Sequence, residues 1–380
     1  MKRILFFTYH HLRSNRQSGV LDYIRMLGNR GFAIDIVTVP THLFWIAQNN
    51  DRESPLNLLK LILGIQEGNI RNWGFPRIMP GRISRTIFKD YRVAGSFTNI
   101  AIRLKKRYNL IVFESTECIE YFEKIKHKYP KTKIIYRASD PIAMYSSNSF
   151  LIQKEREIIA QCDEAWVLDT DTINFYNKHG FCINKCKVIP NYYYSNNDIS
   201  VIEKLVLDSS SRNCIVYFGA QPIDYKLLCE VGDQFPDEVF YIFGPYDLPS
   251  TNNVHYAGSR PMQEIYPYLA RAKMMIIPYA INGSKNFYMK IGRKIAFAKL
   301  FGLPIVVINS AKFAESSDVI FADDTSQFID GIAIFLNRHI DYYANHLKAL
   351  TELDSYNYSN LEKVIDMLVS DICREENNDK

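Results

Sequence analysis

YAINGSKNFYMKIGRKIAFAKLFGLPIVV, residues 279–307, is the stretch that decides the fold. An apolar run at 274–278 precedes it, and β-branched residues at 305–307 end it, so a buried strand is predicted on each side. Between the strands lie a polar loop, a basic segment and an apolar helix, which is the order expected in a parallel sheet. The loop and helix start offer free backbone N–H groups and a positive dipole end, and Lys290 and Lys294 add point charges. The stretch therefore predicts a binding site for a phosphate or diphosphate.

The composition is that of a globular protein with room for two domains. The chain has 380 residues, of which 47% are hydrophobic and 23% charged. A net charge of +5 is too small to indicate a nucleic-acid partner, and no nucleic-acid-binding module is present. No apolar run reaches the ~18 residues of a spanning helix, and the N-terminal apolar run is too short for a signal peptide. The seven cysteines lack the spacing of a disulfide framework or a zinc site, so a cytoplasmic protein is expected.

Apolar strands alternate with helices along both halves of the chain. A strand at 3–8, a helix at 19–29 and a strand at 33–39 form the first βαβ unit. The alternation returns beyond residue 110 and restarts beyond residue 211. The sequence therefore predicts an α/β protein of the two-domain, doubly wound, Rossmann-like kind, with the domains facing a central cleft. The expected parts are a first Rossmann-like domain at 1–192, a second at 193–355, and a C-terminal helical segment at 356–380 that packs back toward the first domain. The run 191–197 is the expected linker.

A basic segment rich in aromatic residues interrupts the first domain between residues 68 and 108. An amphipathic helix is expected just before it, at 56–65. The segment has two interpretations: a docking face for an anionic lipid surface, or a solvated helix surface. Trp73, Phe75 and Phe88 among arginines favour the membrane interpretation.

The second half resembles GT-B glycosyltransferases in an ordered set of short motifs. They are Val188–Asn191, Tyr217–Ala220, Phe243–Pro245, Val254–Pro261, Ile276–Tyr279, and Lys294 eight residues before Gly302-Leu303-Pro304. More narrowly, Arg137-Ala138-Ser139-Asp140 and Tyr288-Met289-Lys290 resemble the GumK family of xanthan glucuronosyltransferases. The resemblance implies inverting transfer of glucuronic acid, or a similar sugar, from a UDP-sugar to a lipid-linked glycan in surface polysaccharide synthesis. Together with the basic segment at 68–108, this predicts a cytoplasmic enzyme attached peripherally to the inner face of the cell membrane.

The resemblance and the positions of the residues together suggest roles for individual side chains. Asp140 follows a strand beside Arg137 and is the expected base, although a turn or helix cap before Pro141 is the simpler alternative. Lys290 is the first choice for the diphosphate ligand and Lys294 the second. The expected nucleotide-sugar site comprises Gly219, Ala220, Arg260, Tyr279, Tyr288, Met289, Lys290 and Lys294. The expected acceptor site comprises His10, His11, Arg13 and Glu114.

Two features bear on cofactors and ribose binding. Many GT-B enzymes hold the ribose with a glutamate three residues after the lysine, where this chain has Phe297. Asp169-Thr170-Asp171 spells the DxD motif of metal-dependent transferases, but it lies between a strand and a helix, where a helix cap is expected instead. No metal or other cofactor is therefore expected.

Two other functions are compatible with the same architecture. A nucleotide-sugar 2-epimerase would need carboxylates in the cleft but no acceptor, so it would change the sugar of the donor alone. A catalytically inactive, glycan-binding scaffold is the other alternative, which the missing ribose glutamate favours and the retained Asp140 and Lys290 oppose.

Overall fold

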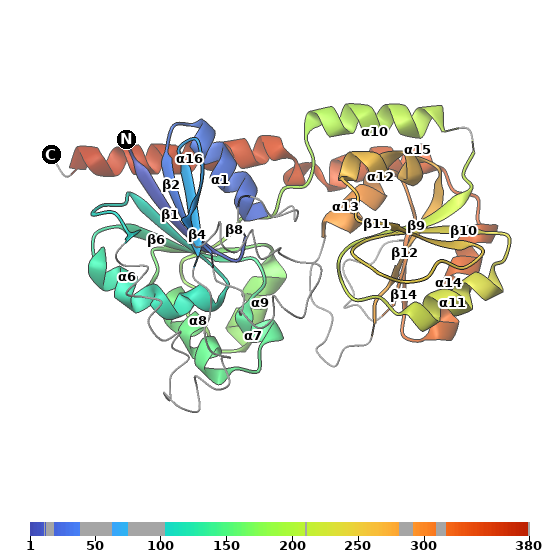
Figure 1. Ribbon diagram of the computed structural model, residues 1–380, viewed down its shortest axis with the longest axis horizontal. Helices are drawn as coiled ribbons and strands as arrows, with labels where there is room; N and C mark the ends of the chain where they lie inside the picture. The colour runs from blue at the N-terminus through green and yellow to red at the C-terminus, as the bar shows by residue number, and fades with distance from the viewer. Residues whose placement is uncertain are drawn as a thin grey trace. The chain divides into compact units, whose positions relative to one another are not determined.

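The computed structural model describes residues 1–10, 12, 19–38, 63–74, 103–209, 211–280, 292–308 and 317–378. The chain divides into two compact units (Figure 1). The first comprises Met1–Asn191 with Leu361–Lys380, and the second comprises Tyr192–Asn360. Each unit is built around its own sheet and is described by itself.

The sheet of the first unit has eight strands in the order β3-β4-β2-β1-β5-β6-β7-β8. Its strand pairs are parallel except β3 with β4. The central strands are buried along nearly their whole length and are mostly apolar, because helices cover both faces of a parallel sheet. The bounds are β1 Arg3–Thr8, β2 Ala33–Thr38, β3 Ile65–Glu67, β4 Ile70–Gly74, β5 Leu110–Glu114, β6 Lys133–Ala138, β7 Glu164–Val167 and β8 Cys186–Val188.

Helices cover both faces of this sheet, with α1 and α16 on one side and α6, α8 and α9 on the other (Figure 1). The bounds are α1 Gly19–Asn29, η1 Glu117–Tyr121, α6 Phe122–Lys128, α7 Ile142–Tyr145, α8 Ser149–Gln161, α9 Thr170–Lys178 and α16 Tyr358–Asn378. The last helix buries the apolar side chains of Leu361, Ile365, Leu368 and Ile372, and polar contacts add to this packing. Lys2 Nζ donates to Cys373 Sγ at 3.0 Å, and Arg30 pairs with Asp366 at 2.9 Å. The C-terminus is thus part of the first unit.

The second unit holds a six-stranded, fully parallel sheet of order β11-β10-β9-β12-β13-β14. Its helices α10, α12, α13 and α15 lie on one side and α11 and α14 on the other (Figure 1). The strands are β9 Cys214–Phe218, β10 Val239–Phe243, β11 Val254–Gly258, β12 Ala272–Pro278, β13 Ile305–Ile308 and β14 Val319–Ala322. The helices are α10 Asn196–Asp208, α11 Tyr225–Gln234, α12 Met262–Ala270, α13 Arg293–Leu300, α14 Thr325–Asn337, α15 Tyr342–Glu352 and η2 Asp354–Tyr356.

The run expected as a linker, 191–197, is mostly structured. Tyr192, Tyr193 and Tyr194 are buried, and Tyr194 forms a bridge with Asn357. Ser195 then starts α10 with a capping box, in which Asp198 accepts from the Ser195 backbone. The chain passes from the first unit to the second between Asn191 and Tyr192, inside the run expected as the linker. The rest of this run is ordered because the three tyrosines bury their rings and Ser195 caps a helix.

In the basic segment at 68–108, the structure places one residue of the proposed membrane-docking face in the core. Trp73 lies on β4 and is only 1% exposed, so it belongs to the core. The Arg71 guanidinium lies 4.4 Å from the Trp73 ring and pairs with buried Asp35 at 3.0 Å. The prediction that Trp73 belongs to a docking face is therefore wrong. Phe75 and Phe88 lie outside the described residues, as does the expected helix at 56–65 except for residues 63–65. In the ranges given above, no helix combines the length and apolarity needed to cross a membrane.

Candidate active site

Polar side chains gather where three neighbouring strands of the first sheet end. β5 lies between β1 and β6, and the register pairs Phe7 with Phe113 and Glu114 with Arg137. Because all three strands are parallel, Thr8, Glu114 and Arg137 come to the same edge of the sheet. This edge is where open α/β sheets bind ligands.

Glu114 is the centre of this polar cluster and is 5% exposed. Thr8 Oγ1 donates to its Oε2, while Ser139 Oγ at 2.7 Å and Arg137 at 3.2 Å donate to its Oε1. Both carboxylate oxygens are therefore engaged inside the protein. This geometry favours an organising role for Glu114 over the direct acceptor contact predicted from the sequence.

Arg137 connects the cluster to the end of the first unit. Its guanidinium is buried, donates to Ser139 and to the side-chain oxygen of Asn191, and lies 5.5 Å from the Tyr23 ring. A Cβ atom at Gly19 would collide with the Asn191 side chain, so a larger residue there would displace Asn191 from Arg137. The start of α1 and residue 191 are thus fixed around one arginine.

Asp140, the predicted base, lies just beyond this cluster. Its backbone N–H donates to Ser115 Oγ at 3.1 Å. The side chain is accessible to solvent although protein atoms crowd around it. Burial and the neighbouring charge of Glu114 raise the pKa of the Asp140 carboxyl above its ordinary range, and Arg137 opposes this rise. An accessible carboxylate with a raised pKa is suited to act as a general base.

Lys294 occupies the corresponding edge of the second sheet. It lies in the first turn of α13, and its Nζ donates to the Tyr217 hydroxyl at 3.3 Å. The ammonium group lies 4.9 Å from the Tyr217 ring centroid and 4.6 Å from that of Tyr279. No carboxylate of the described residues lies within ion-pair distance of this half-buried lysine. Burial lowers its pKa to about 7.

Close backbone packing shapes the loop beside Lys294. A Cβ atom added to Gly219 would lie 2.7 Å from both Lys294 Nζ and the Tyr217 hydroxyl, so the lysine approaches because residue 219 has no side chain. The Tyr246 hydroxyl lies 3.0 Å from the Gly219 carbonyl oxygen and 2.7 Å from that of Gln221. The loop that contains Gly219 and exposed Ala220 is therefore held from two sides.

Of the other residues predicted to belong to the two sites, the structure describes Arg260 and His10. Arg260 is exposed after β11 and pairs with Glu264 at 3.4 Å. His10 lies next to the first cluster, since its backbone N–H donates to Thr8 Oγ1 at 3.0 Å. His11, Arg13, Tyr288, Met289 and Lys290 lie outside the described residues.

Two sequence features take structural roles. Asp169 caps α9 by accepting from the Thr172 N–H at 2.7 Å, which confirms the cap expected for the DxD sequence. Within the described residues no cluster of His, Cys, Asp and Glu could hold a metal ion. Phe297 is 2% exposed and its ring centroid lies 5.6 Å from that of Tyr266, so this position faces the core.

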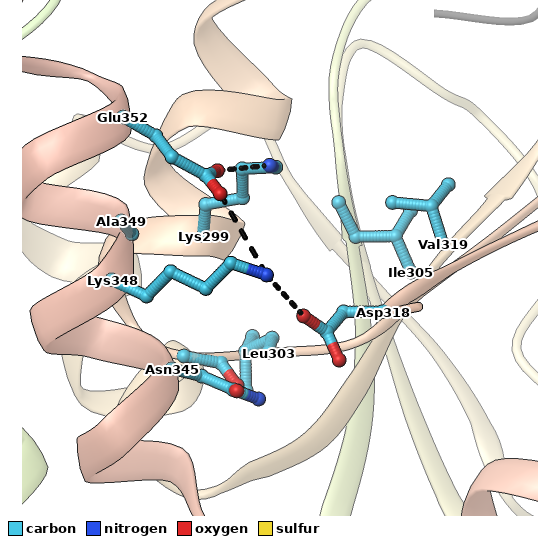
Figure 2. Close-up of a pocket in the computed structure, with 10 residues that line it drawn as sticks. Lys299, Leu303, Ile305, Asp318, Val319, Asn345, Lys348, Ala349 and Glu352 are labelled. Atoms are coloured by element: carbon cyan, nitrogen blue, oxygen red, sulfur yellow. Dashed lines mark hydrogen bonds and ion pairs between the residues drawn. The ribbon is translucent and has the colours of Figure 1, made fainter. Parts of the chain in front are cut away.

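A separate hollow in the second unit lies at the opposite end of its sheet, where β13 and β14 begin. Figure 2 shows Lys348 extending between Asp318 and Glu352, and Lys299 meeting Glu352. Two lysines and two carboxylates balance each other there. The hollow has no excess charge for an ionic ligand, unlike the surroundings of Lys294.

Sequence reasoning missed Tyr246, whose hydroxyl contacts the loop of Gly219 from a different element. Tyr217 stood within a motif taken from the resemblance, but its contact with Lys294 spans 77 residues. No local pattern could have indicated these partners.

Comparison with known proteins confirms the resemblance and the fold. Residues 6–168 match the family model of the glucuronosyltransferase GumK N-terminal domain. Sucrose-phosphate synthase of Thermosynechococcus elongatus superposes with a TM-score of 0.65 at 13% identity, covering 100% of both chains. HepE of Anabaena, solved in complex with UDP-glucose, gives 0.63 at 13% identity, covering 98% of this chain and 100% of that one. A glycosyltransferase of Rickettsia africae gives 0.55 at 12% identity, covering 98% of each chain. No curated protein sequence matches significantly.

The chain thus has the GT-B fold of two Rossmann-like domains, and its first unit resembles the GumK N-terminal domain.

Proposed function

We propose that this chain is a glycosyltransferase that uses a UDP-sugar donor. The observation that carries the proposal is Lys294, a half-buried cation without a carboxylate partner among the described residues, at the carboxyl edge of a parallel sheet. The complex of HepE with UDP-glucose, on a similar fold, supports a uridine nucleotide as the ligand.

In this proposal the second unit binds the donor diphosphate. Lys294 Nζ neutralises the charge that grows on the leaving diphosphate as the bond to the sugar breaks. The first N–H groups of α13 have no partner within the helix, and Gly292 offers no side-chain cap, so they can donate to a phosphate oxygen. Gly219 lets the backbone of its loop approach the lysine closely, and Tyr279 offers a ring face.

The first unit supplies the base. Asp140 takes the proton of the acceptor hydroxyl, whose oxygen then forms a bond to the anomeric carbon as the bond from that carbon to the diphosphate breaks. The products are the inverted glycoside and UDP. The raised pKa of Asp140 makes its carboxylate more basic than an ordinary aspartate, which favours this proton transfer.

The finer assignment is a glucuronosyltransferase that acts on a lipid-linked oligosaccharide in surface polysaccharide synthesis, at the inner face of the cell membrane. The match of residues 6–168 to the GumK N-terminal domain supports it. Met289 and Lys290 would contact the uridine nucleotide, as the resemblance implies. The buried Trp73 does not support membrane attachment, so that part depends on the lipid-linked nature of the proposed acceptor.

A donor screen tests the proposal. Thermal shift and calorimetry with UDP, GDP and their sugars should select UDP, and UDP-glucuronate among the sugars. Incubation with UDP-glucuronate and a lipid-linked acceptor should release UDP and give a product of inverted configuration. Because Lys294 supplies the cationic charge, we expect EDTA to leave the rate unchanged.

Three outcomes would contradict the proposal. Binding of GDP in preference to UDP would reject the donor class. Conversion of the donor sugar without an acceptor would indicate an epimerase, and donor binding without any turnover would indicate an inactive scaffold. Undiminished transfer by an Asp140→Asn variant would reject the base.

A further inference from the structure

A second buried carboxylate, Glu155 on α8, lies outside the clusters described above. Its residue is fully buried, at 0% exposure. Its Oε1 accepts from the hydroxyls of Tyr136 at 2.6 Å and Tyr176 at 2.8 Å. Buried carboxylates are rare unless their oxygens are fully satisfied. The Glu155 carboxylate accepts hydrogen bonds from several elements, which indicates a specific structural role.

The remaining partners of Glu155 belong to the turn that follows Asp140. The backbone N–H of Ile142 donates to Oε1 at 2.9 Å, and that of Ala143 donates to Oε2 at 2.8 Å. These groups open the short helix α7, which begins after Pro141 and has no side-chain cap of its own. Since the first N–H groups of a helix have no partner inside it, Glu155 acts as a cap supplied from another helix.

Asp140 is therefore held on both sides of its backbone. Before it, Ser115 accepts from the Asp140 N–H, and after it, Pro141 leads directly to the two N–H groups bound by Glu155. Backbone N–H groups can only donate, so these contacts require an acceptor at both carboxylate oxygens. An ionised Glu155 meets this requirement. In a glutamine, one of the two oxygens is replaced by an NH₂ group, which would face another N–H or O–H donor and could not accept from it.

We propose that Glu155 is a positioning residue that fixes the orientation of Asp140 toward the acceptor hydroxyl, an inference that rests on the proposed function. In this proposal Glu155 has no part in donor binding, because the four groups that donate to it all belong to the first unit. Its loss should lower the rate of the chemical step and leave donor affinity unchanged.

The test is the Glu155→Gln variant, with Glu157→Gln as the matched control. Glu157 lies on the same helix, is partly exposed and pairs with Lys154. We expect Glu155→Gln to lower kcat by about tenfold or more without changing the KM for the donor. The acidic limb of its pH–rate profile should also move, because a loosened turn changes the surroundings of Asp140. The control should behave like the wild type in all three measurements.

Amide hydrogen exchange gives a readout that does not depend on activity. Exchange at Ile142 and Ala143 should accelerate in Glu155→Gln and stay slow in the control. If the wild type transfers no sugar, the proposed function fails, while unchanged exchange at these two amides would separately overturn the clamp. Wild-type kcat in Glu155→Gln would overturn the positioning role.

A milder variant covers the case in which Glu155→Gln does not fold. Tyr176→Phe removes one of the four donors and keeps the carboxylate. We expect a smaller fall in kcat, of about twofold to fivefold, with the KM for the donor unchanged. A rise in that KM without a fall in kcat would contradict the inference.

Discussion

Replacement of Lys294 by methionine should stabilise the protein and abolish its binding of the donor. Methionine keeps an apolar stem of similar length between the rings of Tyr217 and Tyr279 and removes the charge. In the folded protein without ligand, this charge has lost much of its hydration and has no carboxylate partner among the described residues. This unpaired, partly desolvated charge destabilises the folded protein without ligand, and the same charge would bind a diphosphate strongly.

The size of the effect follows from the lowered pKa. A pKa that falls from the ordinary 10.5 to about 7 would correspond to about 5 kcal/mol for a fully buried lysine below pH 7. Because Lys294 is only half-buried, water screens the charge, and we expect a gain of on the order of 2 kcal/mol.

The sign of the pH dependence is fixed by the direction of the pKa change. Between about pH 7 and pH 10.5 the unfolded chain binds a proton that the folded chain has released, so wild-type stability attributable to Lys294 rises with pH. The methionine variant lacks this rise, so the excess of its free energy of unfolding over that of the wild type should be largest below pH 7. Wild-type affinity for UDP should weaken as the pH rises above about 7, because the free lysine loses its charge.

Urea unfolding at about pH 6 and about pH 9, with calorimetric titration of UDP, measures both effects. Lys299→Met is the matched control on the same helix, since Lys299 pairs with Glu352 at 2.7 Å. It should lose up to about 1 kcal/mol and keep UDP affinity. Wild-type UDP affinity in Lys294→Met, or a loss of stability at both pH values, would refute the reasoning.

Three further substitutions test the two clusters. Asp140→Asn should lower kcat by at least about a hundredfold with UDP affinity unchanged, as steady-state kinetics and calorimetry would show. Glu114→Gln should shift the acidic limb of the pH–rate profile to lower pH, because it removes a negative charge that raises the pKa of Asp140; a shift to higher pH would contradict this. Gly219→Ala should weaken UDP binding about tenfold, since its Cβ would displace Lys294 or Tyr217; unchanged affinity would mean that the loop adjusts freely.

Much of the secondary structure was predictable because apolar runs and helix ends are local features. The helices Gly19–Asn29 and Met262–Ala270 have the predicted bounds, since glycine or proline and apolar periodicity mark them. Helix α10 was missed because its start lies in the run expected as the linker, although its apolar residues Ile199, Ile202 and Val206 have helical spacing. Trp73 was misplaced because an arginine-rich context suggested a surface, whereas pairing of β4 with β2 buries it.

The parallel alternation of strands and helices also determined, from the sequence alone, that Asp140 and Lys294 each follow a strand at the ligand-binding edge of a sheet. That conclusion needs only the order of elements and the right-handed connection between parallel strands. Protonation and orientation depend on neighbours far away in the chain, such as Glu114 for Asp140 and Tyr217 for Lys294. Burial and charge proximity are properties of the folded packing, so only the tertiary structure could show that Glu114 and Glu155 are buried with both carboxylate oxygens hydrogen-bonded. The same holds for the finding that Lys294 has no carboxylate partner among the described residues.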